Sequence, residues 1–324
     1  MKPCYIVLPT LLLYLVGCEK IAILATPKKK PIKSSTELAS KAKENFWFIF
    51  HHGHYERIAE TDALLMESYL ANPNDPQLAR YLGALHTWKI TERQRETVQN
   101  PLVVNEIILA KKYFSDALVL DPHDAFSEGL LGDAELIEGQ IFNDAREQVQ
   151  GYFTLQQAIS HWPEFNYFTA GYPMKPTLSP QSRQFKDTLN WLWKNMDVCA
   201  GETLNRKNPD LRPYMSREVH HGKQRACWNS WTAPYNFEGV CMDMGDILVK
   251  AGDWQTGIIM YQNAKLAENY SSWPYRYMLE RRIQNAKENV IYFQQDNTTS
   301  DRSIMFNSGY GCMACHQQGT NTKG

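Results

Sequence analysis

Four segments of the sequence share one spacing of residue types. A small residue is followed four positions later by an apolar or aromatic residue, three later by a second small residue, and usually five later by proline. The copies are Ala110, Phe114, Ala117 and Pro122; Gly151, Leu155, Ala158 and Pro163; the weaker Thr61, Leu65, Ser68 and Pro73; and Gly257, Tyr261 and Ala264 with Pro274 displaced. Small residues let two helix backbones approach, and proline ends a helix because it lacks an amide proton. The spacing therefore predicts a series of helical hairpins.

A second element accompanies the first. Leu82-Gly83 follows Pro73, and Leu131-Gly132 follows Pro122, nine and ten residues on in each case. Together the two elements resemble the tetratricopeptide repeat. The resemblance implies an all-α fold in which residues 36–164 and 241–294 form a helical-hairpin repeat solenoid. A generic α-helical bundle is the alternative.

Two stretches interrupt the repeats. About fifteen residues more than a standard repeat needs lie between Gly83 and Ala110, and they form either a lengthened helix pair or a loop. Residues 165–240 are broken by prolines, and only one helix, at about 179–198, is expected there. Such a large irregular segment often carries specificity. An amphipathic helix at residues 279–293 is expected to cap the solenoid, because its last apolar face needs a cover.

The N-terminal residues are similar to a bacterial lipoprotein signal. Lys2 precedes an apolar run that ends in Leu15-Val16-Gly17-Cys18. The resemblance implies that residues 1–17 are removed and that Cys18 receives lipid, with residues 18–35 as a tether. Glu19, rather than Asp, follows the cysteine, which favours the outer membrane over the inner. An ordinary signal peptide with a chance cysteine is the alternative.

The most specific motif lies at the C-terminal end of the sequence, in residues 295–324. Cys312 and Cys315 are two residues apart, and His316 follows directly. This pattern resembles the haem-attachment motif of c-type cytochromes. It implies one covalent haem c, with both thiols added to the porphyrin and His316 as the proximal iron ligand. The resemblance covers only Cys312 to His316, so we expect a linker and tail on the helical body rather than a cytochrome domain.

Other chemistry can use the same residues. A thioredoxin-like thiol pair would lie in a strand–helix context, which the sequence around Cys312 and Cys315 lacks. A zinc site would need a fourth ligand close by, and none follows the motif. Haem is therefore the favoured interpretation, provided that the chain is exported.

The sequence offers several candidates for the sixth iron ligand and does not select one of them. His51, His52 and His54 end an aromatic run in which Trp47, Phe48 and Phe50 would suit a porphyrin. His220, His221 and Met305 are the other candidates. A site without a sixth ligand, or one completed by another protein, is also compatible with the sequence.

The remaining cysteines allow a disulfide. Of seven cysteines, Cys4 leaves with the signal, Cys18 takes lipid, and the two tail cysteines take haem. Cys199, Cys227 and Cys241 remain, and an oxidising compartment would let two of them pair. Cys227 with Cys241 is the expected pair, because the two are close in sequence.

These features favour a lipid-anchored periplasmic haem protein over an enzyme. It would transfer electrons or sense redox state, and its helical body would bind periplasmic redox or envelope proteins. No distal Arg–His pair, Ser-His-Asp order or phosphate loop can be recognised. A net charge of −1 gives no reason to expect nucleic acid. The alternative is a non-haem scaffold lipoprotein for envelope assembly, with Cys312 and Cys315 as thiols or a metal clip.

Overall fold

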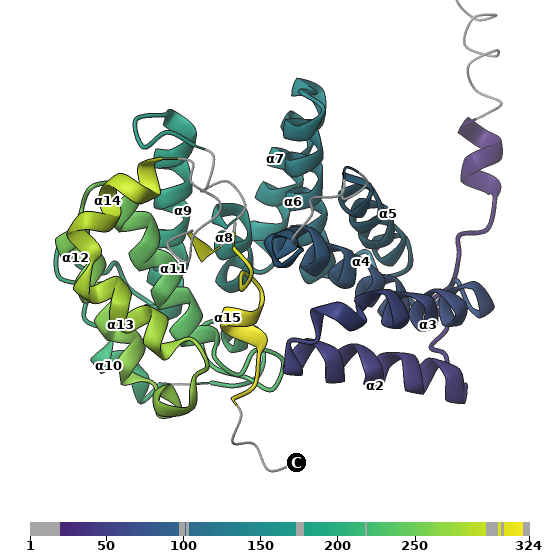
Figure 1. Cartoon of the computed structure of the whole chain (residues 1–324). Helices are drawn as coiled ribbons and strands as arrows, with labels where there is room; N and C mark the ends of the chain where they lie inside the picture. The colour runs from purple at the N-terminus through teal and green to yellow at the C-terminus, as the bar shows by residue number, and fades with distance from the viewer. Residues whose placement is uncertain are drawn as a thin grey trace, which may run out of the picture.

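The computed structural model describes residues 20–96, 101, 104–172, 178–217, 219–295, 304–305 and 308–319. It confirms the all-α fold (Figure 1). The signal, Cys4 and Cys18 lie outside the described residues. Residues 20–25 are helical, and the α-helices that follow are α2 (Glu37–His52), α3 (Ile58–Ala71), α4 (Pro76–Thr91), α5 (Val104–Leu120), α6 (Ala125–Ile141), α7 (Ala145–His161), α8 (Pro163–Gly171), α9 (Arg183–Ala200), α10 (Arg212–Met215), α11 (Asn236–Lys250), α12 (Trp254–Asn263), α13 (Arg276–Gln284), α14 (Ala286–Gln294) and α15 (Met313–His316).

Local sequence sets several of these helix boundaries. Thr36 accepts a hydrogen bond from the amide of Ala39 and starts α2. Gly53 ends the same helix in the left-handed conformation, at φ 67°, which glycine adopts without steric cost. Asp75 caps α4, and Pro76 occupies the first turn, where no amide proton is needed. These residues therefore fix where α2 begins and ends and where α4 begins.

The predicted close approach of small and apolar residues recurs in the hairpins. At each crossing, a glycine on the first helix lies against the apolar side chain at the second position of the repeated spacing. A Cβ atom on Gly83 would lie 2.7 Å from the ring of Phe114, and one on Gly132 would lie 2.7 Å from Cγ of Leu155. Gly245 is packed against Tyr261 in the same way. The same contact between a glycine and an apolar side chain therefore joins α4 to α5, α6 to α7 and α11 to α12.

The segment expected to be irregular contains a further hairpin. Gly171 at the end of α8 faces Leu192 of α9, whose Cγ a Cβ atom would approach to 2.9 Å. The expected helix at about 179–198 is confirmed as α9, but the expectation that it stands alone is wrong. Among the described prolines of this segment, Pro180, Pro209 and Pro234 lie between helices, and Pro213 lies in the short α10. Irregular backbone is concentrated in residues 201–217 and 219–235, around the short α10.

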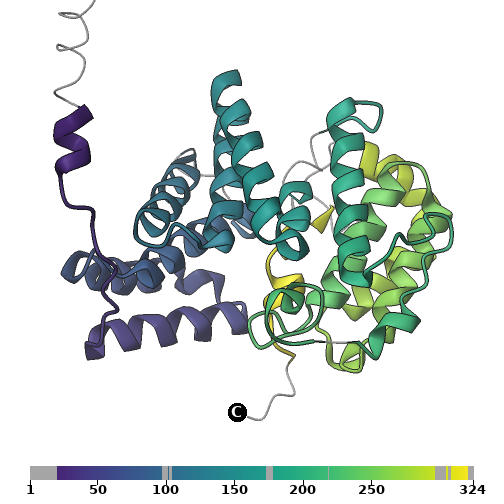
Figure 2. The same cartoon turned by 180° about the vertical axis from the view of Figure 1, so that it is seen from behind.

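Consecutive helices from α2 to α9 contact one another in chain order. α11, α12, α13 and α14 form a second group, and the expected single capping helix is divided at Asn285 into α13 and α14. Figures 1 and 2 show α15 between α2 and α11, with α9 on the α11 side, and α15 contacts both α2 and α11. None of the described helices is both long and apolar enough to span a lipid bilayer.

The predicted disulfide is wrong. Cys227 pairs with Cys199 at the end of α9, across a Cα–Cα distance of 5.5 Å. Cys241 is a free thiol and fully buried on α11. Closeness in sequence is misleading here, because α11 turns Cys241 into the core while the irregular segment returns Cys227 to α9.

The glycine contacts can be tested by a double-mutant cycle at Gly83 and Phe114. We expect G83A to lower the free energy of unfolding by about 1–3 kcal/mol, because the new methyl group overpacks the ring. In F114L the ring is absent, so adding G83A should cost much less than it does in the wild type. Urea unfolding of the four proteins measures the coupling. Equal costs in both backgrounds would show that the two residues are not packed together.

The disulfide assignment predicts a labelling pattern. In the unfolded, unreduced protein, an alkylating reagent should modify Cys241 and leave Cys199 and Cys227 unmodified until a reductant is added. Peptide mass analysis measures this. A free Cys199 together with a protected Cys241 would contradict the structure.

Candidate haem-attachment site

Cys312 caps α15, which carries the rest of the motif, and α15 contributes to the two largest hydrophobic cores of the molecule. Met313 is buried among residues of α2, α3 and α4, including Phe50 and Trp88. Ala314 and Cys315 are buried in the core that α11 and α12 form with their neighbours. The motif is therefore an internal part of the molecule, although the sequence suggests a tail on a linker.

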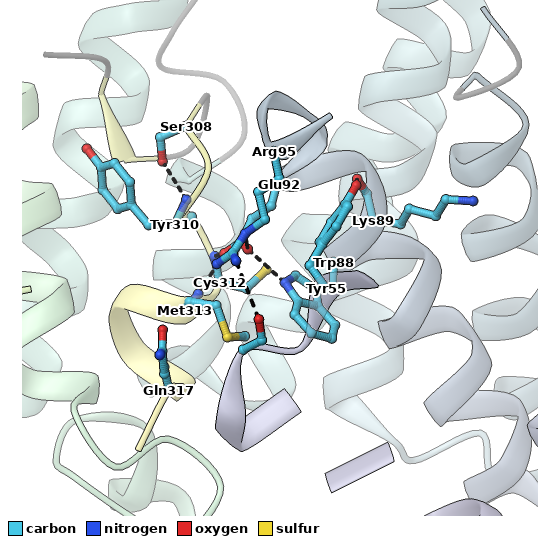
Figure 3. A network of polar contacts seen from close by, with 12 residues as sticks. Tyr55, Trp88, Lys89, Glu92, Arg95, Ser308, Tyr310, Cys312, Met313 and Gln317 are labelled. Atoms are coloured by element: carbon cyan, nitrogen blue, oxygen red, sulfur yellow. Dashed lines mark hydrogen bonds and ion pairs between the residues drawn. The ribbon is translucent and has the colours of Figure 1, made fainter. Parts of the chain in front are cut away.

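A buried carboxylate holds the start of α15. Oε1 of Glu92 accepts hydrogen bonds from the amides of Cys312, at 2.7 Å, and Met313, at 2.8 Å (Figure 3). Its Oε2 accepts from Nε1 of Trp88, at 2.9 Å, and Nε of Arg95, at 2.8 Å. Glu92 has no exposed surface. Charge-assisted bonds of this kind are stronger than neutral ones, and four donors share one charge here.

Burial raises the pKa of Glu92, and Arg95 together with the amide donors acts in the opposite direction. Arg95 lies in the η2 turn (Arg93–Arg95) directly after Glu92. Both residues belong to the insertion that interrupts the repeats. The insertion therefore supplies the group that receives the C-terminal motif.

The carbonyl groups of the motif are also satisfied. The hydroxyl of Tyr172 donates to the carbonyl of Gly311 at 2.6 Å. Nε1 of Trp273 donates to Ala314 at 2.8 Å, and the amide of Tyr235 donates to Cys315 at 3.0 Å. These donors come from the end of α8 and from the residues around α11 and α13. Buried backbone groups without partners are costly, so these contacts fix the orientation of α15.

No disulfide joins the two motif thiols to each other. Cys312 is partly buried, and burial, followed by the charge of Glu92, raises the pKa of its thiol well above the usual range. Cys315 is buried against Gly239 of α11, where a side chain would collide with its sulfur. Because redox-active thiol pairs depend on an accessible thiolate, this environment does not suit a thioredoxin-like reaction.

His316 has a defined tautomer. Its Nδ1 lies 2.6 Å from the backbone carbonyl oxygen of Thr232, which can only accept a hydrogen bond. Nδ1 therefore carries the proton, and Nε2 is left with a lone pair. Burial lowers the pKa of His316 to about 4, so the ring is neutral at pH 7; the Thr232 carbonyl opposes this shift and His51 adds to it. The ring of Phe50 packs against it at 4.7 Å between centroids.

The candidate sixth ligands lie in different environments. His51 is buried near His316, with Trp47 and Trp231 against its ring. His52 and His54 stack with the exposed Phe48, on the outer side of α2. His220 and His221 are exposed, and His220 contacts the carbonyl of Asn229. Met305 is buried in the core around α11, where its backbone contacts Asp246. The structure therefore brings one candidate, His51, to the side of His316 that Thr232 occupies.

Within the part of the chain that the structure describes, no three His, Cys, Asp or Glu side chains converge as a metal site would require. Sequence reasoning missed Glu92 and Thr232. Thr232 acts through its carbonyl, which every residue type has, and Glu92 resembles the solvated charges around it. Comparisons with family models, with curated proteins and with solved structures find no match for this chain.

The Glu92 contacts predict a large effect of the E92Q substitution. A Gln side chain offers one acceptor oxygen, so Arg95 loses its buried ionic partner and the motif loses a charged acceptor. We expect the free energy of unfolding to fall by about 3 kcal/mol. Cys312 and Cys315 should also react faster with a thiol reagent in the haem-free protein. Urea unfolding and timed alkylation measure the two effects.

The control is E60Q. Glu60 forms an exposed ion pair with Arg57 on α3, and exposed pairs contribute little to stability. E60Q should leave both measurements unchanged. An E92Q protein that behaves like E60Q would show that the carboxylate does not hold α15.

Proposed function

We propose that this chain is an exported c-type haem protein that transfers single electrons. Cys312 and Cys315 would bind the haem through thioether bonds, and His316 would bind its iron through Nε2. The observation that carries the proposal is the hydrogen bond from Nδ1 of His316 to the Thr232 carbonyl. A metal-binding histidine commonly donates its other ring proton to a carbonyl, which fixes the tautomer and the ring orientation.

The arrangement of α15 supports the same proposal. Cys312, Cys315 and His316 occupy positions i, i+3 and i+4 of one helical turn, so they share one face. Bound haem supplies a one-electron couple. The chain's own residues hold the Nδ1 proton of His316, leave the lone pair on Nε2 and pack Phe50 against the ring. A ligand held in this way changes little when the iron changes charge, which favours electron transfer.

The disulfide and the N-terminus support export. A Cys199–Cys227 bond is typical of an oxidising compartment, which is also where c-type haem is attached. We propose that Cys18 carries the lipid anchor, with the outer membrane favoured, and that the hairpin body, proposed to be tetratricopeptide-like, binds a periplasmic redox or envelope protein.

The burial of Cys315 sets one condition. Its sulfur packs against Gly239, so the thiol is accessible to haem only while α15 is undocked. Attachment therefore precedes docking of the motif between the two groups of helices.

The proposal is tested by expressing the full chain with its signal in a bacterium that has a working haem-ligation system. We expect the wild type to keep haem after denaturing electrophoresis, with a mass increase of one haem. C312A/C315A should lose it, because both thioether bonds are absent. C241A is the matched control, since Cys241 is a free, buried thiol outside the motif, and it should keep the haem. A wild type without haem and with free motif thiols would overturn the proposal in favour of a scaffold lipoprotein.

A further inference from the structure

The described chain begins with a short apolar helix, at residues 20–25, whose residues are all exposed. Ile21, Ile23 and Leu24 are 66%, 65% and 83% exposed. Figures 1 and 2 both show this helix apart from the other helices of the molecule. Consecutive apolar side chains are normally buried, so their exposure here indicates a surface that another molecule covers.

A basic stretch follows the helix. Lys28, Lys29 and Lys30 are consecutive, Lys33 lies three residues further on, and Lys20 precedes the apolar side chains. All five lysines are exposed, and no acidic residue lies between residues 20 and 36. The whole chain has a net charge of −1, so this segment is far more positive than the rest of the protein. The partner that covers the apolar side chains therefore carries negative charge.

Hydrogen bonds hold the end of this segment on the helical body. The amide of Ile32 donates to the carbonyl of Asn74 at 2.8 Å, and Nδ2 of Asn72 donates to the carbonyl of Ile32 at 2.8 Å. The amide of Ser34 donates to Oδ2 of the buried Asp75 at 2.9 Å. These contacts attach the segment to the turn between α3 and α4. Because an extended chain spans about 3.5 Å per residue, the apolar helix lies within about 25 Å of that turn.

We propose that residues 20–33 bind the surface of an anionic lipid bilayer. The apolar side chains would enter the boundary between headgroups and acyl chains, and the lysines would contact the lipid phosphates. A nucleic acid would satisfy the lysines but would leave Ile21, Ile23 and Leu24 in water. The proposed lipid on Cys18 would bring the segment to a bilayer. The inference goes beyond the proposed function, because it requires neither that lipid nor haem.

The test measures the binding of the mature chain to lipid vesicles by sedimentation. Cys18 is replaced by serine and a cleavable signal without a lipidation site exports the chain, so no covalent lipid contributes. We expect C18S to bind vesicles of equal parts phosphatidylglycerol and phosphatidylcholine, and to bind vesicles of phosphatidylcholine alone much more weakly. Added salt should weaken the binding, because it screens the attraction between lysine and phosphate.

Two variants of C18S separate the contributions of charge and apolar surface. K28Q/K29Q/K30Q should bind the anionic vesicles about a hundredfold more weakly, since each lysine close to such a surface contributes about fivefold. I21S/I23S/L24S should weaken binding by about tenfold or more and should keep its dependence on salt.

The matched control is K186Q/K194Q/K287Q. These three lysines are also exposed, but they lie on α9 and α14. The control should bind the anionic vesicles as C18S does. A loss of binding equal to that of K28Q/K29Q/K30Q would show that only the total charge matters, and would overturn the proposal.

Two further outcomes would contradict lipid binding. Equal binding of C18S to both kinds of vesicle, or binding to neither, would show that the segment does not recognise an anionic bilayer. Unchanged binding by I21S/I23S/L24S would show attraction to any polyanion. Because every changed residue is exposed, circular dichroism should show that all variants are folded. Haem content is measured separately on the wild type, so a failure of this proposal and a failure of the proposed function are distinguishable.

Discussion

The buried carboxylate of Glu92 is the interaction on which the position of the motif depends. An ion in the interior costs several kcal/mol unless nearby groups compensate it. Two of its four donors come from its own neighbourhood, Trp88 and Arg95, and two are backbone amides of the motif. Without α15, half of the compensation is lost. The C-terminal segment is therefore required by the core that receives it, and Glu92 and α15 stabilise each other.

The site is assembled from segments that are far apart in the chain. α2 supplies His51 and Phe50, the insertion supplies Glu92, and the irregular segment supplies the carbonyl of Thr232. The insertion between Gly83 and Ala110 and the irregular segment both contact the motif at α15. The parts of the chain that depart from the repeated spacing are therefore the parts that bind the motif.

Regular packing could be predicted from the sequence, and long-range contacts could not. Gly83 and Phe114 each belong to a recurrent spacing of small and apolar residues, and a sequence displays such a spacing directly. The α8–α9 hairpin was missed because Pro173, Pro176 and Pro180 suggested irregular structure throughout residues 165–240. The disulfide was misassigned because sequence distance does not report which way a helix turns Cys241. His51 was among several candidate ligands, and only burial distinguishes it from His52. Glu92 could not be identified, because the sequence does not distinguish a buried glutamate from a solvated one.

The same packing orders the assembly of the molecule. The hydrogen bond between Glu92 and the amide of Cys312 joins residues 220 positions apart. Contacts at such separation form late, because closing a long loop costs entropy before the contact repays it. The hairpins use local contacts and can form first, while Cys312 and Cys315 remain exposed. Under the proposed function, this interval is when haem can reach both thiols. Docking of α15 then buries Cys315 against Gly239 and brings His316 to Thr232 and His51. Under the proposed function, covalent attachment and docking of α15 would be separate steps, and the long loop between Glu92 and Cys312 would set their order.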